Sequence, residues 1–260
     1  MRAARLSVRR WPGSEPRIHA LHGFAGNGGD FSLLHDRLPY AMDAVDLLGH
    51  GSSPSSEEPA DYAAERQVAL LDGCLPGNCL LLGYSMGGRL ALQYAAARPG
   101  RVRALILVGA SPGLSDEQER TSRQAWDEAQ ARRLESEGLP AFLAHWWNLP
   151  IIRSQASIEP AHLARMRGDR QAAAAGSLCA SLRGFGTGSM PPLWTSLSGI
   201  RCPVLLVAGE TDEKYRRINR ELAGRLQAES AVIGGAGHCA HLERPEACAE
   251  HIRSFVEGLC

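Results

Sequence analysis

The stretch CLLLGYSMGGRLALQYAAAR (residues 79–98) joins a continuously apolar run to a run with helical spacing. The apolar run over residues 79–83 predicts a strand covered on both faces, and the following run predicts a helix. A serine lies at the junction, between Gly83 and Gly87. In such a G-x-S-x-G turn the backbone at the serine is strained and glycines avoid side-chain clashes. We therefore expect Ser85 Oγ to stand above the sheet as a candidate nucleophile.

The same alternation of apolar and amphipathic runs continues on both sides of this stretch. Buried strands are predicted over residues 18–21, 42–47, 104–109, 204–209 and 231–235, and helices over residues 29–38, 64–75, 88–99 and 218–228. Strands that alternate with helices form βαβ units. The predicted fold class is therefore α/β, with a mostly parallel central sheet and helices on both of its faces.

One long region interrupts this alternation. Between residues 115 and 192 no segment has the pattern of a strand; helical, charged segments cover 116–138, 140–150 and 160–182, and a glycine-rich stretch covers 184–194. A helical insertion between two strands predicts a lid over the carboxyl edge of the sheet, where α/β proteins bind ligands. We expect an N-terminal part of the core (residues 1–112), a helical lid (113–192) and a C-terminal part of the core (193–260).

The composition excludes several classes of protein. The 260 residues carry 28 Lys and Arg against 28 Asp and Glu, so the net charge of zero offers no field that would draw the chain to nucleic acid or an anionic membrane. No apolar run approaches the roughly 20 residues of a membrane helix, and no apolar stretch follows the basic start. The seven cysteines form no CxxC pair, and His238, Cys239 and His241 lack a second cluster to complete a metal site. We expect a cytoplasmic protein without metal or cofactor.

Two later segments supply partners for Ser85. The strand predicted before residue 210 is followed by three carboxylates, and among them Asp212 has the usual position of a catalytic acid. Glu210 and Glu213 are expected to be solvated or paired with arginines. The last predicted strand is followed by His238. The chain order serine, aspartate, histidine is the one expected of an α/β-hydrolase triad.

A second loop supplies an oxyanion hole. His22-Gly23-Phe24 follows the first predicted strand, where this fold places one backbone donor, and the other donor comes from the residue after the nucleophile. The expected donors are the N–H groups of Phe24 and Met86. The remaining histidines receive structural roles: His22 shapes the oxyanion loop, His50 lies in a turn, His145 and His162 lie on lid helices, and His241 starts or caps the last helix.

Six motifs together resemble one family of this fold. They are LHGFAGNGGDF (21–31), DLLGHGSS (46–53), GYSMGGRLALQYA (83–95), SLRGFGTGSMPPLW (181–194), AGETDEKY (208–215) and GAGHCAHLERP (235–245). The resemblance covers residues 18–257 and is to the 2-succinyl-6-hydroxy-2,4-cyclohexadiene-1-carboxylate synthases (MenH family) of menaquinone biosynthesis. Its most specific parts are the arginine after GYSMGG, the segment from SLRGFGTG to PLW, and GExDxK.

The resemblance implies a lyase that eliminates pyruvate from 2-succinyl-5-enolpyruvyl-6-hydroxy-3-cyclohexene-1-carboxylate, with Ser85 as base rather than acylating nucleophile. Such a small polycarboxylate needs fixed cations, and arginine forks hold carboxylates bidentately. The substrate contacts that the resemblance implies are Tyr84, Arg89, Arg123, Trp146, Arg167 and Lys214, the only lysine of the chain. The expected assembly is a monomer or small homo-oligomer.

The chain departs from this family in the predicted lid. Met190 stands where many relatives have glutamine, one of the prolines at 191–192 replaces a serine, and Ile152-Arg153 replaces a more apolar pair. Two other interpretations of the function remain open. A serine carboxylesterase or carbon–carbon hydrolase would use the same triad with an acyl intermediate or an activated water. A binding protein would capture a ligand under the lid without chemistry.

Overall fold

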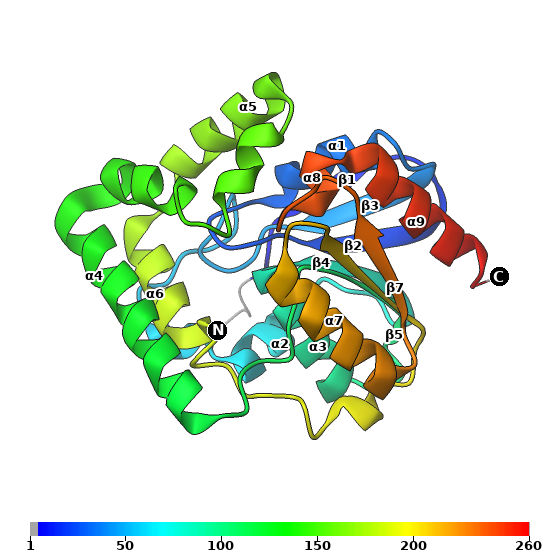
Figure 1. The fold of residues 1–260 in the computed structure, drawn as a ribbon. Coiled ribbons are helices and arrows are strands. Elements are labelled where there is room, and N and C mark those ends of the chain that lie inside the picture. The colour runs from blue at the N-terminus through cyan, green and yellow to red at the C-terminus, as the bar shows by residue number, and fades with distance from the viewer. Residues whose placement is uncertain (1–4, 260) are drawn as a thin grey trace.

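A seven-stranded sheet forms the centre of the computed structural model, which describes residues 5–259 (Figure 1). The strands are β1 (Val8–Trp11), β2 (Ser14–Leu21), β3 (Tyr40–Val45), β4 (Cys79–Tyr84), β5 (Val102–Val108), β6 (Val204–Gly209) and β7 (Glu229–Ile233). Their order is β1-β3-β2-β4-β5-β6-β7, and only the pairing of β1 with β3 is antiparallel. The predicted α/β class with a mostly parallel sheet is confirmed.

Helices cover both faces of the sheet because alternate strand residues point to opposite sides. Leu81 of β4 packs in a core with α2 (Ala64–Asp72), α3 (Met86–Ala97) and α7 (Glu213–Leu226). Leu80 and Leu82 pack on the other face, with α1 (Ser32–His35), α8 (Ala240–Glu243) and α9 (Pro245–Glu257). Short 3-10 helices lie in the connections: η1 (Gly28–Phe31), η2 (Pro59–Tyr62), η3 (Arg153–Ser157) and η4 (Leu197–Gly199).

Strand β1 was not among the predicted strands. It contains Arg9 and Arg10, which are exposed, so it lacks the apolar run that marks the inner strands. Charged side chains are typical of a sheet edge because they discourage pairing with another chain. The helix predicted over residues 29–38 is also shorter, consisting of η1 followed by α1.

Residues 113–192, here called the helical insertion, connect β5 to β6 and contain α4 (Glu117–Trp147), α5 (Pro160–Gln171) and α6 (Ala175–Phe185). No strand lies within it in the structure. The predicted segments 116–138 and 140–150 form one helix that is broken at Gly138, whose φ of 79° is left-handed. The helices share an apolar core that includes Leu134, Phe142 and Leu178. In Figure 1, α4 and α6 lie side by side and α5 lies above them, all to one side of the sheet.

A buried ion pair joins the insertion to the core. Arg170 of α5 donates from Nη2 to Asp30 Oδ2 at 2.9 Å, and the two side chains are 8% and 3% exposed. Asp30 lies in η1, so the pair connects α5 to the loop that follows β2. Burial raises the pKa of the Asp30 carboxyl, and the Arg170 charge acts in the opposite direction.

Replacement of Arg170 by methionine is expected to lower the free energy of unfolding by about 3 kcal/mol, because it leaves the Asp30 carboxylate buried without its partner. Urea denaturation of the full chain measures this. The double variant Asp30→Asn/Arg170→Met should recover much of the loss, since it leaves no buried charge. Equal stability of Arg170→Met and the wild type would contradict a structural role for the pair.

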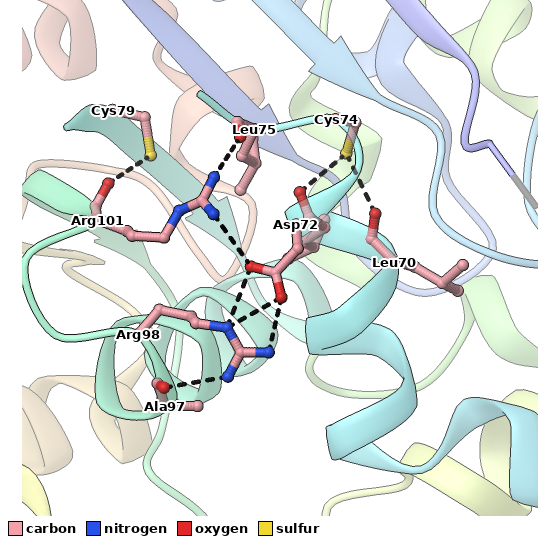
Figure 2. A network of polar contacts seen from close by, with 9 residues as sticks. Leu70, Asp72, Cys74, Leu75, Cys79, Ala97, Arg98 and Arg101 are labelled. Atoms are coloured by element: carbon pink, nitrogen blue, oxygen red, sulfur yellow. Dashed lines mark hydrogen bonds and ion pairs between the residues drawn. The ribbon is translucent and has the colours of Figure 1, made fainter. Parts of the chain in front are cut away.

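A second polar network lies at the ends of α2 and α3 (Figure 2). The Asp72 carboxylate accepts from Arg98 Nη2 at 2.6 Å, and Arg101 Nη1 lies 3.7 Å from it. Arg101 also donates to the carbonyl of Leu75. The Arg98 hydrogen bonds lower the pKa of Asp72. This network fixes the connections that lead into β4 and β5.

No helix within residues 5–259 combines the length and the apolarity that crossing a membrane requires. The six cysteines in this part of the chain are unpaired, and Cys260 lies outside the described residues.

Candidate active site

Ser85 occupies a strained turn between β4 and α3. Its backbone has φ 49° and ψ −109°, a region that non-glycine residues rarely adopt. The turn packs so closely that a Cβ at Gly87 would collide with the Leu21 carbonyl oxygen, and a Cβ at Gly83 would lie 2.5 Å from Gly88 Cα. The glycines of the motif therefore let the turn pack against β2 and α3, which raises the serine above the strand ends.

His238 lies between Ser85 and Asp212. Its Nε2 is 3.0 Å from Ser85 Oγ, and its Nδ1 is 2.7 Å from Asp212 Oδ2. His238 and Asp212 are 4% and 8% exposed. The ring approaches the end of β5 so closely that a Cβ at Gly109 would lie 2.8 Å from its Cε1. These contacts orient the imidazole so that one nitrogen faces the serine and the other the carboxylate, as a proton relay requires.

Asp212 is also held by the backbone. It is the N-cap of α7, and its Oδ1 accepts from the N–H of Tyr215 at 3.3 Å. The neighbouring acids take other roles, because Glu210 accepts from the Gly235 N–H and Glu213 is exposed. The structure thus brings Asp212, and neither glutamate, against His238.

Two backbone N–H groups are free to serve as oxyanion donors. Within residues 5–259, neither the Phe24 nor the Met86 N–H donates a hydrogen bond. Met86 begins α3, and the first N–H groups of a helix have no intrahelical partner. The loop around Phe24 is shaped by His22, whose Nδ1 lies 2.7 Å from the Gly23 carbonyl and whose Nε2 accepts from the Leu47 N–H.

A cavity of about 370 Å³ opens above Ser85. Its walls come from the turn, the insertion and the start of α7. The lining residues are Phe24, Ser85, Met86, Arg89, Arg123, Trp126, Asp127, Trp146, Leu149, Pro150, Ile151, Ile152, Ser181, Leu182, Phe185, Gly186, Thr187, Lys214, Tyr215 and His238. The structure therefore brings four of the six residues with expected substrate contacts to one cavity: Arg89, Arg123, Trp146 and Lys214.

Arg89 is the most buried cation of the cavity, at 8% exposure. Its Nη1 donates to the Phe185 carbonyl at 2.8 Å and contacts Met190 Sδ at 3.4 Å. Burial lowers its pKa to about 10, so it stays charged at neutral pH. No partner in the described chain takes its Nε or Nη2 hydrogens, which leaves donors for a bound anion. The methionine that departs from the family pattern at 190 thus touches this guanidinium.

Arg123 and Lys214 reach the cavity from two different elements. Arg123 of α4 donates from Nε to Asp127 at 3.0 Å and stacks over Trp126. Lys214 of α7 makes no ion pair in the described chain, and its Nζ lies 5.6 Å from the centre of the Tyr215 ring. Desolvation, followed by the charges of Arg123 and Arg89, lowers the pKa of Lys214.

Asp127 is a cavity residue that the sequence analysis missed. It is 1% exposed, its Oδ2 has no hydrogen-bond partner in the described chain, and burial raises its pKa. Its position four residues after Arg123 on α4 is the available sequence signal, because residues i and i+4 are neighbours on a helix. Asp127 is thus a buried counterion of Arg123 in the cavity wall.

Aromatic and aliphatic side chains complete the cavity. Trp146 packs 4.8 Å from Phe24 and 6.0 Å from Trp126 between ring centres. The connection after α4 adds Ile151 and Ile152. This wall is suited to the face of a small ring.

Three expectations need correction. Tyr84 does not line the cavity; it is 5% exposed, and its ring lies 4.6 Å from that of His241 and 5.5 Å from that of His238. Arg167 lies outside the cavity lining and stacks over Trp147 on the insertion. His241 is fully buried in α8 and packs on Phe31, so it does not start or cap the last helix, α9.

Comparisons with known proteins identify the family of the chain. The model of the alpha/beta hydrolase family matches residues 20–251. The chain is 35% identical over 254 residues to a putative 2-succinyl-6-hydroxy-2,4-cyclohexadiene-1-carboxylate synthase of Bacillus subtilis (strain 168), covering 95% of this chain and 93% of that protein. It is 32% identical over 232 residues to the synthase of Escherichia coli O1:K1 / APEC, covering 88% and 89%.

Solved structures give the same result at the level of the fold. MenH from S. aureus matches with a TM-score of 0.89 at 28% identity, covering 97% of this chain and 98% of that one. A thermophilic esterase from Thermogutta terrifontis matches with a TM-score of 0.83 at 24% identity, covering 98% and 93%. The fold alone therefore does not separate elimination from ester hydrolysis.

Proposed function

Because this chain belongs to the alpha/beta hydrolase family and, within it, to the 2-succinyl-6-hydroxy-2,4-cyclohexadiene-1-carboxylate synthases, we propose that it eliminates pyruvate from 2-succinyl-5-enolpyruvyl-6-hydroxy-3-cyclohexene-1-carboxylate. The product is 2-succinyl-6-hydroxy-2,4-cyclohexadiene-1-carboxylate. The observation that carries the proposal is the meeting of Arg89, Arg123 and Lys214 with Ser85 in one cavity. A polycarboxylate can use all three cations, whereas a neutral ester has no use for them.

Ser85 acts as the base in this proposal. His238 accepts the Oγ proton, and Asp212 stabilises the imidazolium that forms. The serine oxygen removes the ring proton alpha to the succinyl carbonyl, and the electron pair moves into an enolate. The enolate then reforms the carbonyl as the ring carbon–oxygen bond breaks. The enolpyruvyl group departs as the enolate of pyruvate, which becomes pyruvate by accepting the proton that His238 took up.

The enolate oxygen rests on the N–H groups of Phe24 and Met86. Such preorganised donors stabilise charge that develops in the transition state, and removing one typically costs about 10²- to 10³-fold in rate. The cations hold the carboxylates so that the acidic carbon faces Ser85 Oγ. Trp146 and Ile152 pack on the ring and keep water away from the enolate.

The helical insertion serves as the lid in this proposal. It supplies Arg123, Trp146 and Asp127 to the cavity, and the core parts (residues 1–112 and 193–260) supply the triad. Arg167 lies on α5 outside the cavity and would reach substrate only through a movement of that helix.

Pyruvate release tests the proposed reaction. We expect the enolpyruvyl substrate to yield pyruvate in an assay coupled to lactate dehydrogenase. Deuterium at the acidic ring carbon should slow the step, since the carbon–hydrogen bond breaks in it. Release of pyruvate at the same rate from the deuterated substrate under conditions where chemistry is rate-limiting would contradict removal of this proton as the rate-limiting chemical step.

The lowered pKa of Lys214 predicts a dependence on pH. Its ammonium attracts a carboxylate only while protonated, so KM should rise as the pH increases through a value below the ordinary 10.5. Lys214→Met should raise KM at neutral pH by about 10- to 100-fold, the worth of a hydrogen bond to a charged group, and should remove this rise. Lys214→Arg should keep a low KM to higher pH. A KM of Lys214→Met equal to that of the wild type would place Lys214 outside the binding site.

A further inference from the structure

Glu243 brackets the loop that carries His238. Its Oε2 accepts from the Gly237 N–H at 2.6 Å and its Oε1 from the Cys239 N–H at 3.1 Å, so both residues beside the histidine are bound to one carboxylate. Glu243 is 4% exposed and is the last residue of α8. A buried carboxylate is costly unless it is hydrogen-bonded, so these bonds fix the loop and the side chain together.

A third bond joins the same carboxylate to the helical insertion. Ser154 of η3 donates from Oγ to Glu243 Oε1 at 2.9 Å. The contact is tight, since a Cβ at Gly237 would overlap the Ser154 side chain. The insertion therefore rests directly on the loop of the catalytic histidine, and Gly237 lets it approach.

Ser154 lies close in the sequence to two residues of the cavity wall. Ile151 and Ile152 line the cavity, and Ile152 precedes η3 directly. A continuous set of contacts thus leads from the cavity through η3 to Glu243, and from Glu243 to the two peptide groups beside His238. Tyr215, whose ring centre lies 4.7 Å from that of His238, supports the imidazole from another side.

We propose that Glu243 is a positioning residue for His238, and that Ser154 couples the seating of the helical insertion to that position. The inference rests on the proposed role of His238 in activating Ser85. Glu243 and Ser154 would thus connect the aliphatic wall of the cavity to His238, although neither side chain lines the cavity or contacts the reacting atoms. Correct seating of η3 then sets the 3.0 Å contact between His238 and Ser85.

The experiment measures pyruvate release by full-length Glu243→Gln and Ser154→Ala. The glutamine keeps the shape but turns an NH₂ group toward one of the backbone N–H donors. We expect kcat to fall about 10- to 100-fold in Glu243→Gln and about 3- to 10-fold in Ser154→Ala, because each variant loses a hydrogen bond to or from a charged group. KM should stay within about twofold of the wild-type value. Glu250→Gln and Ser136→Ala, at exposed positions, are the matched controls and should retain wild-type rates.

The double variant tests the coupling. If Ser154 acts through Glu243, then Glu243→Gln/Ser154→Ala should be no slower than Glu243→Gln alone. Losses that multiply would overturn the coupling, and a wild-type kcat in Glu243→Gln would overturn the positioning role. Thermal melting checks the fold of each variant; should Glu243→Gln not fold, a wild-type kcat in Ser154→Ala would overturn the coupling by itself.

A second readout does not depend on the natural substrate. Diisopropyl fluorophosphate phosphorylates an activated serine: the Oγ–P bond forms, the P–F bond breaks, fluoride leaves and His238 takes the proton. The rate of Ser85 modification should fall in the two variants and stay unchanged in the controls. A wild type that reacts with the reagent but releases no pyruvate would refute the proposed reaction, and the variants' modification rates would still test the role of Glu243.

Discussion

Ser85→Ala is expected to lower kcat for pyruvate release by about 10³- to 10⁶-fold, the range found when a triad serine is removed from other enzymes. The alanine lacks the oxygen that receives the ring proton, whereas binding by Arg89 and Lys214 is retained. KM should therefore change little. Steady-state kinetics with the coupled assay measures both constants.

The control for this variant is Ser254→Ala, an exposed position on α9. Both variants should unfold at the wild-type temperature, because the Ser85 hydroxyl has His238 as its hydrogen-bond partner in the described chain and supports no other element. A folded Ser85→Ala that releases pyruvate at a near-wild-type rate would refute the triad assignment.

Arg89→Ala is expected to lower kcat/KM about 30- to 1,000-fold. This corresponds to a loss of about 2–4 kcal/mol of transition-state binding, since truncating one partner of a buried charge pair costs this much. The guanidinium lies within one turn of Ser85 and has free donors toward the cavity. Arg89→Lys should recover part of the loss, because it keeps a charge but not the fork.

Arg98→Ala is the matched control. Arg98 follows α3 directly but binds Asp72 in the network of Figure 2, away from the cavity. It should leave kcat/KM unchanged. If Arg89→Ala unfolds more easily but keeps the wild-type kcat/KM while folded, Arg89 supports Phe185 and Met190 only and holds no carboxylate.

The arrangement of the core and of the triad could be predicted because both depend on local patterns. Apolar runs identify the inner strands, and parallel strands end at the same edge of the sheet, where Ser85, Asp212 and His238 follow their strands. Strand β1 could not be found in this way, because its pairing with β3 depends on tertiary contacts and two of its four side chains, Arg9 and Arg10, are charged.

The remaining site residues depend on packing between distant segments. In the sequence, Asp127 is one of many charged residues of α4. Its burial beside Arg123 depends on how the insertion folds. In the sequence, Glu243 has no feature that distinguishes it from other acidic helix residues. Only the geometry of the loop brings its carboxylate to the N–H groups of Gly237 and Cys239. Tyr84 shows the converse error, since a motif position beside the serine does not imply that the side chain lines the cavity.

The most direct test of the account compares two reactions of the purified chain: pyruvate release from the enolpyruvyl substrate and hydrolysis of a short p-nitrophenyl ester. We expect pyruvate at about 10 per second or faster, a typical enzymatic turnover, with little ester cleavage. Rapid ester cleavage without pyruvate would contradict it, and would mean that Ser85 is an acylating nucleophile and that the three cations hold no substrate carboxylate.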